Sequence, residues 1–162
     1  MAGNGTDSSD DVDPGDGHSY GTGLADEEIE TLLYERGVGV LSLARSGHAY
    51  GIPVSYGYDA TGDRFLLDLG FAPESKKRSY LETTEQASLT IFEWHSPTDW
   101  QSIVATGDVD PIEEFDRTLE ELYHASARDV DVAVFGHLPE DLEHQWYELS
   151  VQTLTGRSSA SH

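Results

Sequence analysis

The segment from residue 49 to residue 58 carries the most regular pattern in the sequence, with large and small side chains in alternation. The large set is Tyr50, Ile52, Val54, Tyr56 and Tyr58, and the small set is Ala49, Gly51, Pro53, Ser55 and Gly57. A period of two predicts a β-strand with one set on each face. A face of such small residues admits a flat ligand, or a neighbouring helix or strand, close to the backbone. Pro53 predicts an edge or an interrupted ladder, because proline has no amide N–H to donate.

Five further apolar runs, separated by turn sequences such as Ser46-Gly47, also predict strands. The six predicted strands span residues 38–44, 49–58, 64–69, 87–94, 102–109 and 146–154. Most follow one another as hairpins, and helices are placed singly between them. This order indicates an α+β fold, a six-stranded antiparallel β-barrel with peripheral helices, and argues against a βαβ unit.

Three helices are expected around the strands. The first has Asp26 as its N-cap and ends at Gly37, because glycine is favoured at the left-handed residue that closes a helix. The second spans about residues 73–85 and opens with Pro73, which suits the first helical position. The third is predicted from an apolar stripe at helical spacing, formed by Ile112, Phe115, Leu119 and Leu122.

The two ends of the sequence contain little that a core could bury. Residues 1–23 are rich in Gly, Asp and Ser and are predicted to form a disordered acidic tail, and residues 158–162 a flexible C-terminus. A single domain of residues 24–157 lies between them. No signal-like stretch and no run of membrane-helix length is present, so we expect a soluble cytoplasmic protein. The sequence has no cysteine, which excludes disulfides and cysteine-ligated metals.

The charge balance limits the possible partners. Asp and Glu number 31 and Lys and Arg number 9, which gives a formal net charge of −22. Such a surface repels nucleic acid and anionic membranes, so neither is expected as a partner. Self-repulsion would destabilise the fold in dilute buffer, whereas at molar salt the Debye length falls to about 3 Å. We therefore expect a halophilic protein from a salt-rich cytoplasm.

The scarce cations include one cluster, Lys76-Lys77-Arg78, which contains both lysines of the chain. The cluster falls in the first turn of the predicted second helix, where backbone N–H groups lack helical partners and the helix dipole is positive. Together these features predict an anion site of the kind that binds phosphate. The alternative is a solvated helix face with ion pairs at i, i+4 spacing, Glu74–Arg78 and Arg78–Glu82.

Other patterns identify no catalytic residue. The sequence has neither a Gly-x-Ser-x-Gly elbow nor a thiol nucleophile. Asp68 is either a site residue or a solvent-facing acid of its strand. Several histidines are scattered without metal-ligand spacing, so no metal site is predicted, and they are His48, His95, His124, His137 and His144.

Six short segments occur in a characteristic order. They are GVGVLSL at 37–43, YGIPVSY at 50–56, SKKR at 75–78, ASL at 87–89, SIVATG at 102–107 and LTGR at 154–157. Their order and spacing resemble the pyridoxamine 5'-phosphate oxidase-like superfamily of FMN-binding split barrels. Within it, the chain resembles the small nitroimidazole-resistance-type branch, in a haloarchaeal-like form. The resemblance spans about residues 24–157.

The resemblance implies a homodimer with two FMN molecules at the subunit interface. Lys76 and Lys77 correspond to the basic pair that grips the FMN phosphate in this superfamily. The segments that line the flavin correspond to Ile52, Pro53, Val54, Ser55, Leu67, Asp68, Leu69 and Ser102. We expect a flavin-dependent oxidoreductase acting on an unidentified small molecule. The alternatives are a non-catalytic flavin-binding or sensing module, and a split barrel that binds haem or deazaflavin.

Overall fold

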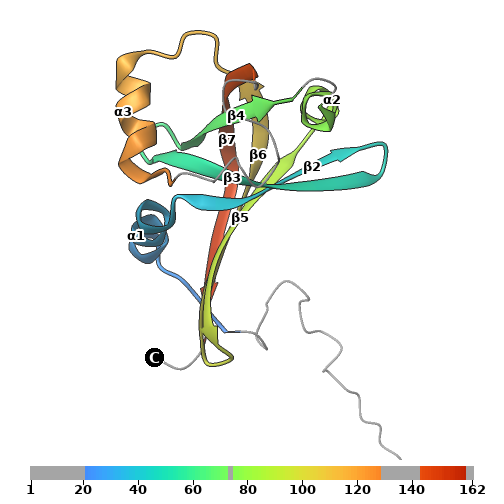
Figure 1. The fold of residues 1–162 in the computed structure, drawn as a ribbon. Helices are drawn as coiled ribbons and strands as arrows, with labels where there is room; N and C mark the ends of the chain where they lie inside the picture. Colours follow the sequence, from blue (N-terminus) through green and yellow to red (C-terminus); the bar gives the residue numbers. More distant parts are fainter. Residues whose placement is uncertain (1–20, 73–74, 129–142, 160–162) are drawn as a thin grey trace, which may run out of the picture.

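The strands predicted from the sequence form one antiparallel sheet in the computed structural model, which describes residues 21–72, 75–128 and 143–159 (Figure 1). The strands are β1 (Thr22–Gly23), β2 (Val38–Arg45), β3 (His48–Asp59), β4 (Arg64–Phe71), β5 (Ala87–Ser96), β6 (Asp99–Pro111) and β7 (Glu143–Ser158). The described helices are α1 (Asp26–Arg36), α2 (Lys76–Thr83) and α3 (Arg117–Ser126). None of these described helices is both long and apolar enough to cross a membrane.

The sheet closes into a barrel because β7 pairs on both of its sides. The strand order is β1-β7-β4-β3-β2-β5-β6, and β6 pairs in addition with β7. The first half of β7 pairs with β4, and most of its length pairs with β6. The predicted antiparallel barrel with peripheral helices is confirmed. The sheet has one strand more than the six predicted, and this additional strand is the two-residue β1.

Alternate residues of the strands point into the barrel and form its core. On β3 the large set shares one face, as predicted, and this face points inward, with Tyr56 fully buried and Ile52 and Val54 nearly so. Other strands contribute Leu41, Leu43, Phe65, Leu67, Leu69, Leu89, Ile91, Ile103 and Leu149, and α1 adds Ile29, Leu32 and Leu33. Burial of each large apolar side chain contributes about 1.5–3 kcal/mol to folding.

The start of α1 differs from the prediction by one residue. Its N-cap is Ala25 rather than Asp26, and the Ala25 amide donates a hydrogen bond to the Glu28 carboxylate at 3.1 Å. This contact satisfies the amide of the N-cap residue itself, which is the half of a capping box that the third helical residue supplies. The predicted end is confirmed, because Gly37 closes the helix with a φ of 69°.

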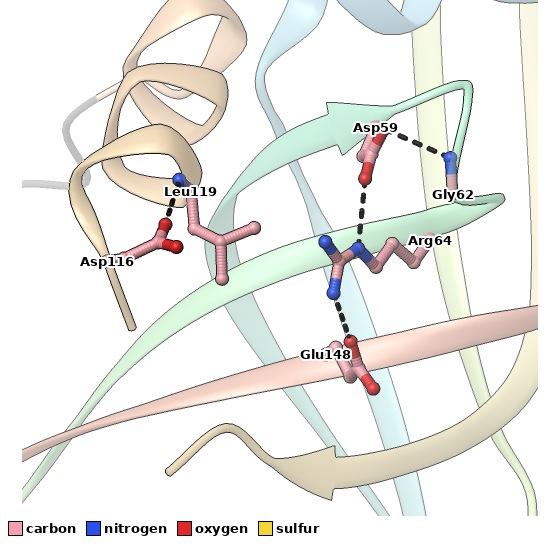
Figure 2. A network of polar contacts seen from close by, with 6 residues as sticks. All are labelled: Asp59, Gly62, Arg64, Asp116, Leu119 and Glu148. Carbon is pink, nitrogen blue, oxygen red and sulfur yellow. Dashed lines mark hydrogen bonds and ion pairs between the residues drawn. The ribbon is translucent and has the colours of Figure 1, made fainter. Parts of the chain in front are cut away.

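The third helix starts later than its apolar stripe suggested. Asp116 caps α3 by accepting a hydrogen bond from the Leu119 amide at 3.0 Å, so Ile112 and Phe115 lie before the helix (Figure 2). Phe115 stacks on Trp146 of β7, with ring centroids 3.6 Å apart. The apolar stripe predicted too early a start for the helix. Phe115 is apolar because it packs on a strand, and its spacing from Leu119 matches that of an apolar helix face by coincidence.

The described structure extends beyond both predicted domain boundaries. β1 pairs with Ser158 and Arg157 of β7, so residues 22 and 23 belong to the sheet. Ser158 and Ser159 are buried, and the Ser159 amide donates to the Trp100 carbonyl at 2.9 Å. Residues 22, 23, 158 and 159 therefore make contacts with the barrel. Most of both predicted tails, Pro73 and the loop after α3 fall outside the described residues.

An ion-pair network fixes the turn between β3 and β4 onto β7 (Figure 2). Arg64 Nε donates to Asp59 Oδ2 at 2.9 Å, and Arg64 Nη1 donates to Glu148 Oε2 at 2.7 Å. The Gly62 amide donates to Asp59 Oδ1 at 3.1 Å. Burial acts to raise the pKa of the Asp59 carboxyl, but the hydrogen bonds from Arg64 and Gly62 outweigh it and hold the pKa below its usual range. The network thus fixes the ends at which β3 and β4 pair.

Candidate functional site

β3 and β4 separate from each other partway along their length, and this opens the barrel on one side. Their described ladder runs only from Tyr56 to Asp59 on β3. Before Tyr56 the described ladder partner of β3 is β2 alone, and beyond Leu67 that of β4 is β7 alone. Each facing edge therefore presents backbone groups outside the described ladders. The edge position predicted for Pro53 is confirmed.

Helix α2 lies at this opening, beside the end of β4 and against the β2–β3 hairpin (Figure 1). Lys77 Nζ donates a hydrogen bond to the Gly70 carbonyl of β4 at 2.9 Å. On the hairpin side, the Tyr80 ring packs on Tyr50 with centroids 5.1 Å apart. Ser75 is the N-cap and accepts a hydrogen bond from the Lys77 amide at 3.2 Å. The basic cluster therefore occupies the first turn of the second helix, as predicted.

The three cations of the cluster have different surroundings. Lys77 is half-buried, and this burial lowers the pKa of its amine. Lys76 is exposed. Arg78 points elsewhere, pairing with Glu143 of β7 at 2.9 Å and lying 4.8 Å from the centroid of the Phe71 ring. Lys76 and Lys77 are therefore the two candidates for contact with an anion.

The structure describes both partners of only one ion pair of the alternative interpretation, Arg78–Glu82. Arg78 and Glu82 form no ion pair within the described residues, because Glu143 from β7 holds the guanidinium instead. Glu74 lies outside the described residues. The strand pairing that brings Glu143 near α2 could not be read from i, i+4 spacing.

The small-residue face of β3 divides into two parts. In its C-terminal part α3 packs directly on the strand, since a Cβ on Gly57 would lie 2.3 Å from the Cα of Tyr123. The buried Ser55 hydroxyl donates to the Arg128 carbonyl just beyond α3. In its N-terminal part the face is exposed at Pro53. Helix packing thus explains one half of the pattern, and the other half is an exposed surface.

The residues predicted to line a flavin do not share one surface. Asp68 lies on the outer side of β4 and pairs with His144 of β7, with 3.1 Å between Oδ1 and Nδ1. The spacing of His144 in the sequence carried no signal, because only the pairing of β7 with β4 brings it opposite Gly70. Four other members of the β3 and β4 segments point into the core, and these are Ile52, Val54, Leu67 and Leu69. These four can reach the opening only through their backbone groups.

Ser102 lies far from α2 within one chain. It sits on the outer side of β6, opposite Phe92 of β5 and Arg157 of β7. Arg157 is near the end of β7, whereas His144, which pairs with Gly70, is near its start. A single chain therefore keeps Ser102 apart from the opening beside α2.

Beside Ser102 and its cationic neighbour Arg157, the outer side of the sheet carries uncharged side chains over five strands. This outer sheet face consists of Val38, Val40, Ser42, Gly51, Pro53, Ser88, Thr90, Phe92, Trp94, Ser102, Val104, Thr106, Thr153 and Thr155. Phe92 and Trp94 are 62% and 61% exposed. The whole chain carries 31 acidic residues, yet none lies in this set. A continuous surface free of acidic side chains, with exposed aromatic residues, is typical of a protein interface.

An antiparallel barrel that opens between two neighbouring strands is a split barrel, the class of fold predicted from the sequence. Residues 25–158 match the family described as pyridoxamine 5'-phosphate oxidase, and the chain belongs to that family. No curated protein matches the sequence.

Solved structures share the fold at low sequence identity. An FAD-binding protein from Mesorhizobium loti has a TM-score of 0.65 and 17% identity, over 86% of this chain and 97% of that one. A putative 5-nitroimidazole antibiotic resistance protein from Bacteroides thetaiotaomicron has a TM-score of 0.63 and 19% identity, over 85% and 86%. A heme-binding protein from Mycobacterium smegmatis has a TM-score of 0.59 and 18% identity, over 84% and 55%. These likenesses establish the fold.

Proposed function

We propose that this chain binds a flavin through the phosphate of its FMN moiety and acts as a flavin-dependent oxidoreductase on a small molecule. The observation that carries the proposal is the position of Lys76 and Lys77, in the first turn of α2 at the opening between β3 and β4. Membership of the family supports a flavin there, as does a solved neighbour described as FAD-binding.

The first turn of α2 has the donors that a phosphate needs. Early backbone N–H groups point out of the helix end, where the positive end of the dipole favours an anion. Lys76 supplies an exposed ammonium group, and Lys77 supplies a half-buried one at the end of β4. Because salt screens long-range attraction, the phosphate would be held by contact hydrogen bonds from these groups.

We assign the isoalloxazine ring to the open edge of β3. The side chains of Ile52 and Val54 face the core, so this segment offers backbone N–H and C=O groups to the polar edge of the ring. Pro53 adds an exposed apolar surface. On the β4 side, Asp68 and its partner His144 supply polar side chains next to the opening.

We assign the outer sheet face to a second copy of the chain, which makes the protein a homodimer. A stable interface buries about 800 Å² on each partner, and a face spanning five strands is of that order. Within one chain Ser102 lies away from Lys77, so a role for Ser102 at the flavin requires the partner to supply it. Each flavin site would then draw residues from both copies.

When bound, the flavin supplies the redox chemistry, and the residues of the chain bind it, orient it and exclude water. No side chain is assigned as a catalytic acid or base. Repeated reduction of bound flavin by a nicotinamide dinucleotide separates an oxidoreductase from a storage or sensing module, whose flavin would not turn over.

The test is the absorption spectrum of protein purified in molar salt, compared with that of the double variant Lys76→Ala/Lys77→Ala. We expect a flavin spectrum from the unaltered chain and loss of most of the flavin from the double variant, with unchanged circular dichroism. Arg117→Ala removes an exposed cation of α3 and serves as the matched control, which should keep its flavin. Full flavin retention in the double variant would overturn the phosphate assignment, and a haem spectrum would overturn the flavin itself.

A further inference from the structure

Arg45, the last residue of β2, contacts α2 through a hydroxyl group rather than through an acid. Its Nη1 donates a hydrogen bond to the Ser79 hydroxyl at 2.7 Å. No carboxylate among the described residues lies within ion-pair distance of it, although acids outnumber cations 31 to 9 in the sequence. A guanidinium has five N–H donors, so one hydrogen bond leaves most of them available to another acceptor.

Lack of a carboxylate is not a general property of the arginines in this chain. Four others each pair with an acid, namely Arg36 with Glu93, Arg64 with Asp59 and Glu148, Arg78 with Glu143, and Arg117 with Glu121. Arg128 also lacks an ion pair, but three backbone carbonyls accept hydrogen bonds from its guanidinium. Arg45, with one hydroxyl partner, keeps donors with which it could bind an external anion.

Lys76 lies on the same flank of α2 as the contact made by Arg45. Residues three apart on a helix face the same side, and the rise from Lys76 to Ser79 is about 4.5 Å. Lys76 is exposed and, within the described residues, has no ion-pair partner. Arg78 is directed elsewhere by its ion pair with Glu143 of β7. Arg45 therefore extends the cationic surface of Lys76 by about one turn along α2.

We propose that Arg45, together with Lys76, binds a second phosphate group, so that the site prefers flavin adenine dinucleotide to FMN. This inference rests on the proposed flavin site, in which Lys76, Lys77 and the first-turn amides hold the phosphate of the FMN moiety, and Lys76 is shared between the two phosphates. In the dinucleotide a second phosphate is bonded directly to the first, and Arg45 with Ser79 lies one short step along the helix from that point. A guanidinium can bind a phosphate through two parallel hydrogen bonds, a contact that survives salt screening better than long-range attraction does.

The test measures dissociation constants for FAD and FMN in molar salt by calorimetry, for the unaltered chain and three variants. We expect the unaltered chain to bind FAD at least about tenfold more tightly than FMN, in line with one charge-assisted contact. Arg45→Gln should lose most of that preference by weakening FAD alone, with FMN affinity kept within about twofold. Ser79→Ala, which removes the hydroxyl that holds Arg45, should reduce the preference in part. Arg117→Gln is the control and should leave both constants unchanged.

Several outcomes would overturn the inference. Equal loss of both flavins in Arg45→Gln would mean that Arg45 only docks the hairpin on α2. Equal affinity of the unaltered chain for FAD and FMN would remove the dinucleotide assignment while leaving the proposed function intact. Stronger FMN binding on addition of millimolar inorganic phosphate, lost in Arg45→Gln, would show that the second anion is a separate molecule. Failure to bind either flavin would overturn the proposed function itself, and this inference with it.

Discussion

Lys77 of α2 and Gly70 of β4 are joined by a hydrogen bond of 2.9 Å from the lysine Nζ to the glycine carbonyl. The contact ties the helix to β4 beyond the point where this strand has left β3, so the basic first turn stands at the opening of the barrel. Burial lowers the pKa of the Lys77 amine. A cation in such surroundings lowers folding stability, and a bound anion would offset that loss.

We expect Lys77→Met to separate binding from stability. Methionine removes the buried charge but also the hydrogen bond to the Gly70 carbonyl, so the two effects oppose each other and the unfolding free energy of the flavin-free protein should change by no more than about 1 kcal/mol. Flavin affinity should fall at least about tenfold, since a charged hydrogen-bond donor to the phosphate is lost. Denaturant unfolding and flavin titration measure the two quantities. A variant that unfolds more easily yet binds flavin normally would make Lys77 a structural residue.

Features of the structure that depend on residues close together in the sequence could be predicted from sequence patterns. The alternation around Tyr56 identified β3 and the two sets of residues that share its faces, because successive side chains of a strand point to opposite sides. The first-turn position of Lys77 followed from the helix pattern after β4. Both are consequences of residues that are neighbours in the sequence.

Contacts made by β7 were not predictable in this way. His144 beside Asp68, and Glu143 beside Arg78, both depend on a strand that returns from far along the sequence to pair with β4. The position of Ser102 shows the same dependence on long-range pairing. The misplaced start of α3 has a different cause, because Phe115 packs on a strand with the spacing of a helix face.

Gly57→Ala should destabilise the fold by forcing α3 away from β3. The added Cβ would lie 2.3 Å from the Cα of Tyr123, a backbone atom that cannot rotate aside. We expect the unfolding free energy to fall by about 1–3 kcal/mol, as in other overpacked cores. Gly23→Ala is the matched control, because an added Cβ there meets nothing within 4 Å. Equal stability of the two variants in denaturant would contradict the close packing of α3 on β3.

Asp59→Asn should weaken the fold at neutral pH and change its response to acid. The folded-state pKa of Asp59 is lowered, so the stability it contributes is present above its unfolded pKa and is lost as pH falls through the folded pKa. We expect a loss of about 1.5–3 kcal/mol near pH 7, the range for hydrogen bonds to a charged group.

The difference in unfolding free energy between Asp59→Asn and the unaltered chain should shrink as the pH falls below about 4. Denaturant unfolding at constant salt over a pH series measures it. Asp63→Asn, at an exposed position of the same turn, is the control. It should leave the decrease in unfolding free energy at acid pH unchanged. If the difference in unfolding free energy between Asp59→Asn and the unaltered chain stayed constant with pH, the charge of Asp59 would not be the source of its stabilising effect.

Salt should stabilise the protein through screening of its acidic surface. The formal charge of −22 repels itself over a Debye length of about 10 Å at 0.1 M salt, and over only about 3 Å at 1 M. We expect the melting temperature to rise steadily with potassium chloride across that range. A variant that neutralises four exposed acids, Glu30→Gln/Glu35→Gln/Glu82→Gln/Glu85→Gln, should show a shallower rise. If the melting temperatures of the two proteins rose equally with salt concentration, the salt effect would have a cause other than charge repulsion.

Val104→Asp should convert the proposed dimer into a monomer. Val104 is 37% exposed, and its ladder partners Thr90 and Thr155 flank it within the outer sheet face. A carboxylate placed there would be desolvated by a second copy, and across a symmetric contact it would also meet its own counterpart. Sedimentation in molar salt should show half the mass of the unaltered protein, whereas Thr118→Asp, an exposed position on α3, should leave the mass unchanged. Flavin should be lost together with the dimer if the partner supplies Ser102. A monomer that keeps its flavin at full affinity would place the whole site within one chain and leave Ser102 outside it.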